Sequence, residues 1–347
     1  MMKPCFRKSA LVARQEFQES LAIWFEKHGK DYPWRRTCDP YAILVAEVML
    51  QQTQIATVLG RGFYQRFLET FPDLESLAGA GDERLLKAWE GLGYYRRARM
   101  LRATAQALLA DHDGKFPVEL DALMKLPGVG RYTAGALRAF AFGLPSAVVD
   151  GNVSRVLSRV MDFSAPVDDG KGHGQIWEWA EVLADSVRPR IYNSAIMELG
   201  QTLCRPGVPE CLICPVAAFC KAGEPERLPV KRQKVAITAV DEHALWLRDA
   251  SGRLLLHREN GKRRQGLWKL PTRPAAEISK LNVLAEDCYM ITRYRVTLRV
   301  HDGSDLKKFC PAEDELWREA KDVMGLAMPS PFRRVIERIS NDSGNGV

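Results

Sequence analysis

The sequence predicts a mainly α N-terminal part followed by a separate α+β domain. From about Phe17 to Ile213, apolar residues recur at helical spacing and strand-like alternation is almost absent. After Cys220, short alternating runs take over. A chain of 347 residues is long enough for two or three domains. We therefore expect a helical region at 1–221, a linker at 222–235 and an α+β domain at 236–347.

Helical periodicity marks the elements of the N-terminal part, and turn residues separate them. We expect helices over Tyr41–Thr57, Glu83–Trp89, Ala98–Leu109 and Val153–Met161. In the C-terminal part we expect strands over Ala236–Val240, Ala244–Leu247, Leu254–His257 and Tyr289–Val300, and helices over Glu313–Gly325 and Pro331–Ile339.

Composition narrows the classes of function. Lys and Arg exceed Asp and Glu by 50 − 43 = 7, and the pI is about 9.0, which suits a polyanionic partner. No apolar run approaches the about 18–20 residues of a membrane span. The basic segment Met1–Ala13 lacks the continuous apolar stretch of a secretory signal. We therefore expect no membrane association, no secretion and, in a bacterium, a cytoplasmic protein associated with the nucleoid.

The six residues Leu126–Arg131 lie between two apolar helical stretches. Gly128 and Gly130 allow a tight turn and close approach of the backbone to a ligand. The following helix then begins near Tyr132, with free amides that can face a phosphate. This pattern predicts a helix–hairpin–helix clamp on the DNA backbone; an ordinary glycine-containing connection is the alternative.

Two carboxylates are candidate catalytic groups: Asp150 follows this hairpin in the sequence, and Glu47 precedes it. Asp150 follows an apolar run and precedes a helix, with Asn152 beside it; either could be a helix N-cap. Glu47 lies within an apolar stretch, where desolvation raises the pKa of a carboxyl and suits it to donate a proton. A salt-bridged helix glutamate is the alternative. The polar residues Gln51, Gln52, Thr53 and Gln54 follow and could bond to bases or the DNA backbone.

Gly91–Arg97 combines flexible backbone, two tyrosines and two arginines. Such a segment can wedge an aromatic ring into a base stack beside phosphate contacts, with Tyr94 as the wedge. A helix start with buried tyrosines is the alternative.

Four of the eight cysteines cluster as Cys204-x6-Cys211-x2-Cys214-x5-Cys220. Without an export signal, such a cluster indicates a metal site rather than disulfides. Four thiolates can hold either zinc or a [4Fe–4S] cluster.

Together these motifs resemble the adenine DNA glycosylases of the MutY type, in the helix–hairpin–helix superfamily that includes endonuclease III. The resemblance runs from about Trp24 to Cys220, with further similarity in the C-terminal part. Its markers are Pro33-Trp34, Glu47–Gln54, Gly91–Tyr95, Leu126–Arg131, Asp150–Asn152, Met197–Gly200 and the four cysteines. It implies two helical subdomains around an adenine pocket, a [4Fe–4S] loop, and a Nudix-like C-terminal domain, indicated by Gly266–Pro271, that lacks the metal-binding Nudix box.

The resemblance also implies roles for single residues. Glu47 matches the general acid and Asp150 the carboxylate that stabilises the sugar cation, supported by Asn152. Tyr132 stands where endonuclease III relatives carry the Schiff-base lysine, which implies a monofunctional enzyme. The remaining matches concern DNA and base binding: Lys30 and Trp34 near the adenine pocket, Gln51, Gln52, Thr53 and Tyr94 near the lesion, and Leu126, Gly128, Gly130 and Arg131 at the backbone.

This sequence departs from the family pattern at two places. The family's Phe-Ser-His element, which meets 8-oxoguanine, is aligned with the strand that holds Thr297, Leu298 and Arg299, and the serine and histidine are absent there. The acceptor that faces adenine is replaced by Ser194. The first departure predicts a smaller preference for 8-oxoguanine over guanine than the family shows, and the second concerns recognition of the adenine.

The chemistry that the resemblance implies is hydrolysis of the N-glycosidic bond of adenine opposite 8-oxoguanine or guanine, in double-stranded DNA, by a monomer. Three alternatives stay open. One is a mismatch glycosylase of the same superfamily with another target, such as thymine opposite guanine. The others are a non-catalytic binder of DNA damage and a zinc-stabilised transcription regulator.

Overall fold

The computed structural model describes residues 8–232, 236–261, 264–304, 306 and 309–344. The chain divides into two compact units: Met1–Gln52 with Thr104–Gln233, and Thr53–Ala103 with Lys234–Val347. The predicted order, mainly helical and then α+β, is confirmed, because in the described part of the chain only helices precede Thr238, where the first strand begins, and both strands and helices follow it. Parts of the expected segments Met1–Ala13 and 222–235 lie outside the described residues.

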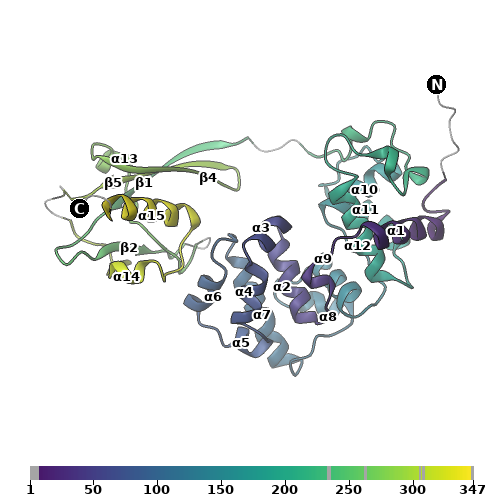
Figure 1. Ribbon diagram of the computed structural model, residues 1–347, viewed down its shortest axis with the longest axis horizontal. Coiled ribbons are helices and arrows are strands. Elements are labelled where there is room, and N and C mark those ends of the chain that lie inside the picture. The colour runs from purple at the N-terminus through teal and green to yellow at the C-terminus, as the bar shows by residue number, and fades with distance from the viewer. Residues whose placement is uncertain (1–7, 233–235, 262–263, 305, 307–308, 345–347) are drawn as a thin grey trace. The chain divides into compact units, whose positions relative to one another are not determined.

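The first unit consists of helices, which Figure 1 shows in purple and teal. Its α-helices are α1 (Arg14–His28), α2 (Pro40–Leu50), α8 (Leu120–Lys125), α9 (Arg131–Ala136), α10 (Gly151–Met161), α11 (Gly170–Leu183) and α12 (Pro189–Thr202). Its short helical turns are η1 (Pro33–Arg35), η2 (Leu137–Ala141), η3 (Cys211–Ile213), η4 (Ala217–Phe219) and η5 (Pro225–Arg227), and η2 is a π-helical continuation of α9. In this unit, α1 and α10 both pack on α12 around a core that includes Leu21, Val156 and Leu199.

Local sequence explains where α2 begins and ends. Asp39 is its N-cap, and its carboxylate accepts hydrogen bonds from the amides of Tyr41 (3.0 Å) and Ala42 (3.2 Å). Pro40 suits the first helical position because its missing N–H has no partner there. The expected single helix over Tyr41–Thr57 is wrong, since α2 ends at Leu50 and α3 starts at Ile55. Gln52 between them has a φ of 58°, which no α-helix accommodates.

The second unit begins with α3 (Ile55–Gly60), α4 (Phe63–Thr70), α5 (Leu74–Ala78) and α6 (Asp82–Ala88), and α7 (Arg96–Asp111) runs from it into the first unit. Its helices pack through aromatic edges, such as Phe67 against Trp89 with ring centroids 5.5 Å apart. They also bond to the C-terminal part of the same unit. The Tyr95 hydroxyl donates to the Met328 carbonyl (2.9 Å), and Arg333 Nε donates to Glu90 (2.6 Å).

Among the described residues of the second unit, six strands form two three-stranded sheets. Figure 1 labels β1, β4 and β5 of one sheet and β2 of the other. Their bounds are β1 (Thr238–Trp246), β2 (Leu254–Arg258), β3 (Trp268–Lys269), β4 (Val283–Ile291), β5 (Tyr294–Asp302) and β6 (Glu315–Arg318). The order is β1-β5-β4 in one sheet and β3-β2-β6 in the other, and β1 pairs with β5 in parallel. The helices of this part are α13 (Ala275–Ile278), α14 (Ala320–Val323) and α15 (Ser330–Gly344). Phe332 and Ile336 of α15 share a buried core with Leu298 and Val300 of β5.

Three expectations for this part are corrected. The two short runs from Ala236 to Leu247 form one strand, β1. The expected strand Tyr289–Val300 is a hairpin, since Thr292 takes a φ of 53° and reverses the chain between β4 and β5. The expected helix Glu313–Gly325 contains β6 and the short α14, because the alternating residues of Glu315–Arg318 pair with β2. Among the helices described here, none is long and apolar enough to cross a bilayer.

Candidate active site and cysteine cluster

Glu47 is a buried carboxyl in the middle of α2. Tyr41–Met49 are all buried, and Glu47 is only 5% exposed. Burial is the main cause that raises the pKa of Glu47 from 4.5 to about 7. A hydrogen bond with Tyr132 opposes this shift, and the charge of Asp150 adds to it. Oε2 of Glu47 has no hydrogen-bond partner in the described part of the chain. Glu47 is therefore poised to exchange a proton near neutral pH, as the apolar stretch predicted.

The hairpin between α8 and α9 brings Tyr132 to this carboxyl. Gly128 takes a φ of 76°, and the Val129 amide closes the turn on the Leu126 carbonyl at 3.1 Å. The next helix, α9, starts one residue before Tyr132. Burial, followed by the charges of Glu47 and Asp150, raises the pKa of Tyr132 well above 10. Tyr132 therefore stays a neutral hydroxyl that bonds to Glu47.

Asp150 caps α10, as one of the two alternatives foresaw. Its carboxylate accepts from the amides of Asn152 (2.8 Å) and Val153 (2.7 Å) and from the Asn152 side-chain amide (2.8 Å). Burial raises the pKa of Asp150, and these three bonds oppose the shift because they favour the charged form. The cap and the catalytic role are compatible, since the charge of Asp150 acts on both Glu47 and Tyr132.

Sequence reasoning missed the group that holds Asp150 and Asn152 in place. Arg155 is 8% exposed, and its Nη2 donates to Asn152 Oδ1 (2.9 Å) and to the Gly200 carbonyl (2.7 Å). Its Nε donates to the Cys204 carbonyl at 2.8 Å. A side chain at Gly200 would collide with Asn152, whose Cβ lies 2.6 Å from the added carbon. No feature of the sequence distinguishes Arg155 from an ordinary solvated arginine on a helix.

The residues of the first unit that are expected to bind DNA differ in their exposure to solvent. Lys30, Gln52, Gly128 and Gly130 are exposed, Gln51 is partly exposed, and Trp34, Leu126 and Ser194 are buried. Trp34 stacks on Tyr32 with ring centroids 5.3 Å apart. Arg131 pairs with Glu181 and lies over the Trp177 ring at 4.2 Å, so its guanidinium is already engaged within the protein.

In the second unit, Tyr94 is 51% exposed and has a φ of 47°. A non-glycine residue in this conformation costs about 1–3 kcal/mol and is concentrated at functional sites. Thr53 accepts a hydrogen bond from Arg97 Nη2 at 3.3 Å. Exposure and backbone geometry thus agree with the wedge predicted at Tyr94, whereas buried-tyrosine packing describes its neighbour Tyr95, 6% exposed.

The structure does not place the expected opposite-base contacts at a free surface. Leu298 and Val300 are 0% exposed, because alternate residues of β5 face the core under α15. Arg299 on the other face is paired with Asp241 and Glu286, each at 2.8 Å. Thr297 lies beside Cys288 with 3.8 Å between Oγ1 and Sγ. Leu298 therefore belongs to the core rather than to a base-reading surface.

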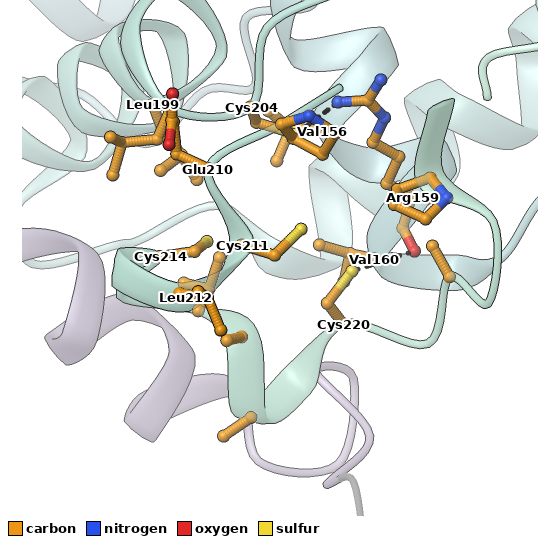
Figure 2. A pocket seen from close by; sticks show the side chains of 17 residues that line it. Val156, Arg159, Val160, Leu199, Cys204, Glu210, Cys211, Leu212, Cys214 and Cys220 are labelled. Atoms are coloured by element: carbon orange, nitrogen blue, oxygen red, sulfur yellow. Dashed lines mark hydrogen bonds between the residues drawn. The ribbon is translucent and has the colours of Figure 1, made fainter. Parts of the chain in front are cut away.

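The four clustered cysteines line one cavity of about 440 Å³. Figure 2 shows them around it, from the end of α12, η3 and the residue after η4. Burial raises the pKa of Cys214 to about 12, and the other three thiols add to the shift. Within the described residues no three His, Cys, Asp or Glu side chains lie close enough to share a single metal ion.

Arg159 anchors the cysteine loop from inside. It is 1% exposed, and its Nη1 donates to Cys204 Sγ (3.3 Å) and the Arg205 carbonyl (2.8 Å). Figure 2 shows this guanidinium beside Cys204. In the loop between Cys204 and Cys211, Glu210 neutralises the charge of Arg205, with 2.6 Å between Arg205 Nη2 and Glu210 Oε1.

Comparison with known proteins agrees with this geometry. Residues 45–178 match the family model of the HhH-GPD superfamily base excision DNA repair proteins. The human adenine DNA glycosylase is 43% identical over 215 residues, which are 59% of this chain and 39% of the human protein. The adenine DNA glycosylase of Buchnera aphidicola subsp. Acyrthosiphon pisum is 31% identical over 67% of this chain and 69% of its own length.

Solved structures add the fold. A thermostable thymine-DNA glycosylase has a TM-score of 0.56 and 29% identity, covering 61% of this chain and 98% of its own. An endonuclease III–DNA complex has a TM-score of 0.50 and 26% identity, covering 62% of this chain and 97% of its own. The chain spans 39% to 49% of the length of the animal, fission yeast and Arabidopsis relatives that it matches. On the similarity to the bacterial relative and the superfamily match around Glu47, Tyr132 and Asp150, the chain belongs to the adenine DNA glycosylase family.

Proposed function

We propose that the chain is a monofunctional DNA glycosylase that hydrolyses the N-glycosidic bond of adenine opposite 8-oxoguanine or guanine. The observation that carries the proposal is the buried Glu47 carboxyl, whose pKa is raised to about 7. This carboxyl hydrogen-bonds with Tyr132, and the charge of Asp150 acts on both residues. The chain's partner is double-stranded DNA, its working state is a monomer, and in a bacterium its compartment is the cytoplasm.

The residues support a stepwise reaction. A base inside a duplex must first be flipped out, at a cost of a few kcal/mol. Protonated Glu47 then donates to N7 of the adenine, and the C1′–N9 bond breaks as the base leaves neutral. Asp150 is held by three donors and stabilises the positive charge on the sugar. Glu47, now a carboxylate, accepts a proton from the water that attacks C1′, as in retaining sugar hydrolysis.

Cys204, Cys211, Cys214 and Cys220 would hold a [4Fe–4S] cluster, which supplies structural order to the loop when bound. Arg159 fits this assignment, since its buried guanidinium donates to the Cys204 sulfur and to the carbonyls of Arg205, Gly207 and Leu228, none of which carries a negative charge. An anionic thiolate site would compensate its charge.

The test is single-turnover base release over a panel of defined mispairs, with Glu47→Gln as the matched variant. We expect adenine release opposite 8-oxoguanine and guanine. The variant should lose roughly 10²–10⁴ in rate, because it lacks the general acid, and should keep duplex affinity. Near-normal rates in the variant would remove Glu47 from the mechanism.

A second candidate is release of thymine opposite guanine. Ser194 favours it, since a short hydroxyl stands where the family carries the acceptor for adenine, and a thymine-DNA glycosylase shares the fold. The same panel decides between them: thymine release without adenine release would replace the first proposal.

A further inference from the structure

Glu198 is the most deeply buried carboxylate that the proposed reaction leaves unused. It is 0% exposed on α12, and its Oε2 accepts from Arg35 Nη1 at 2.7 Å. Its Oε1 is buried and finds no hydrogen-bond donor among the described residues. A buried acceptor without a donor costs about 1–3 kcal/mol, so such a group indicates a partner that the free protein does not supply.

Glu198 lies on one helical face with Arg190 and Ser194, at intervals of four residues. Arg190 and Glu198 both tie this face to the segment 30–38. Arg190 Nη2 donates to the carbonyls of Arg35 (2.7 Å) and Thr37 (2.6 Å). Ser194, the short residue at the expected base pocket, therefore lies between two polar anchors that join α12 to the segment of Lys30 and Trp34.

Arg35 completes the arrangement. Its Nη1 also donates to the Lys30 carbonyl at 2.7 Å, and its guanidinium lies over the rings of Tyr32 (4.7 Å) and Phe25 (5.0 Å). These contacts fix the guanidinium, which in turn holds Oε2 of Glu198. The free Oε1 is thus presented at a fixed position, one helical turn from Ser194.

We propose that Glu198 is a specificity-determining residue, whose free Oε1 accepts a hydrogen bond from the exocyclic amine of the flipped base. This inference rests on the proposed glycosylase activity. The amine is the donor that distinguishes adenine from purines with a carbonyl or hydrogen at the same carbon. Ser194 has a shorter side chain, and Glu198 supplies the acceptor from the next turn of the helix.

The experiment compares single-turnover release of adenine, hypoxanthine and unsubstituted purine, each opposite 8-oxoguanine, by wild-type protein and Glu198→Gln. The glutamine oxygen can still accept from Arg35, while its amide presents a donor in place of Oε1. Adenine release should fall by roughly 10- to 100-fold, the size expected for a hydrogen bond to a charged group. Purine release should change by less than about threefold, and hypoxanthine, which offers an acceptor, should gain relative to adenine.

The matched control is Asp185→Asn, which changes a carboxylate of 5% exposure that accepts from the backbone amides of Val187 and Arg188 and pairs with the Arg188 side chain at 3.6 Å. Its ratios of release rates among the three bases should equal those of the wild type.

Two results for Glu198→Gln would overturn the inference. An equal loss of rate for all three bases would show a structural role for Glu198. Rates unchanged from the wild type would show that the base does not contact Oε1. Should Glu198→Gln not fold, Glu198→Asp keeps the charge for Arg35 and withdraws the acceptor, so adenine must again lose more than purine. A wild-type protein that releases none of the bases would instead refute the glycosylase itself.

Discussion

At the scale of single residues, the site depends on burial more than on charge pairing. Glu47 has no cationic partner among the causes of its shifted pKa, and Tyr132 meets it with a neutral hydroxyl. Sequence alone could predict this environment, because an unbroken apolar run surrounds the glutamate. It could not show the Tyr132 bond, since that contact joins residues far apart in the chain through the packing of α2 on α9.

The raised pKa of Glu47 makes stability depend on pH. Its pKa is about 7 in the folded protein and near 4.5 when unfolded, so the folded state binds the proton more tightly. The resulting stabilisation is complete below pH 4.5, falls as pH rises and is lost above about 7; its size is about 3 kcal/mol.

Glu47→Gln stays neutral at every pH, and its melting temperature should therefore exceed that of the wild type increasingly between pH 5 and 8. Glu181→Gln, at an exposed ion pair, serves as control. A difference between Glu47→Gln and the wild type that does not vary with pH would contradict the shifted pKa.

Tyr132→Lys should add strand cleavage to an enzyme that otherwise leaves an intact abasic site. An amine at the start of α9 could attack C1′ of the sugar as a Schiff-base nucleophile. The measurement is borohydride trapping of a protein–DNA adduct, with Tyr132→Phe as control. Abundant adduct in the wild type would mean that another lysine reacts and that the enzyme is not monofunctional.

At the scale of elements, α10 connects Asp150, the proposed catalytic carboxylate, to the cysteine loop. Asp150 caps its first turn, Arg155 bonds to the Cys204 carbonyl, and Arg159 bonds to the Cys204 sulfur. The sequence predicted this helix, the possible cap at Asp150 and, separately, a metal site at the cysteines. The arginines could not be recognised, because an arginine on a helix is usually solvated and only the fold shows that these two are buried.

Arg155→Met should lower the free energy of unfolding by about 2–4 kcal/mol, since the carbonyls of Gly200 and Cys204 and the amide oxygen of Asn152 lose a buried donor. Arg205→Met removes an exposed pair and should cost less than about 1 kcal/mol. Chemical denaturation of both variants measures the difference. Equal losses would show that the buried bonds contribute no more than a surface ion pair.

At the scale of the whole molecule, the sequence predicted the order of a helical and an α+β part, and the composition of each. It did not predict that Thr53–Ala103 groups with the C-terminal part, because hydrogen bonds such as Arg99 to the Gln265 carbonyl join residues 166 positions apart. The expected base contacts on β5 were wrong for Leu298, because α15 covers the face of the strand on which Leu298 lies.

Purified protein should contain about four irons per chain and be yellow-brown if the four thiols that line the cavity hold the proposed [4Fe–4S] cluster. Iron and zinc analysis of protein made under iron-replete, anaerobic conditions is the measurement. Cys211→Ser should reduce the iron content, whereas Cys38→Ser, outside the cavity, should leave it unchanged. Stoichiometric zinc in the unmodified protein would refute the iron–sulfur assignment.

The interleaving of the two units has a consequence for synthesis on the ribosome. The chain leaves the first unit after Gln52, returns at Thr104 and leaves again at Gln233. Helices α3 to α6 therefore emerge long before the residues that complete their unit, such as Met328 for Tyr95 and Arg333 for Glu90. The first unit can fold once Gln233 has emerged from the ribosome. Helices α3 to α6 cannot complete their unit until Lys234–Val347 has been synthesised. The order in which the units mature is thus not the order in which their residues are made.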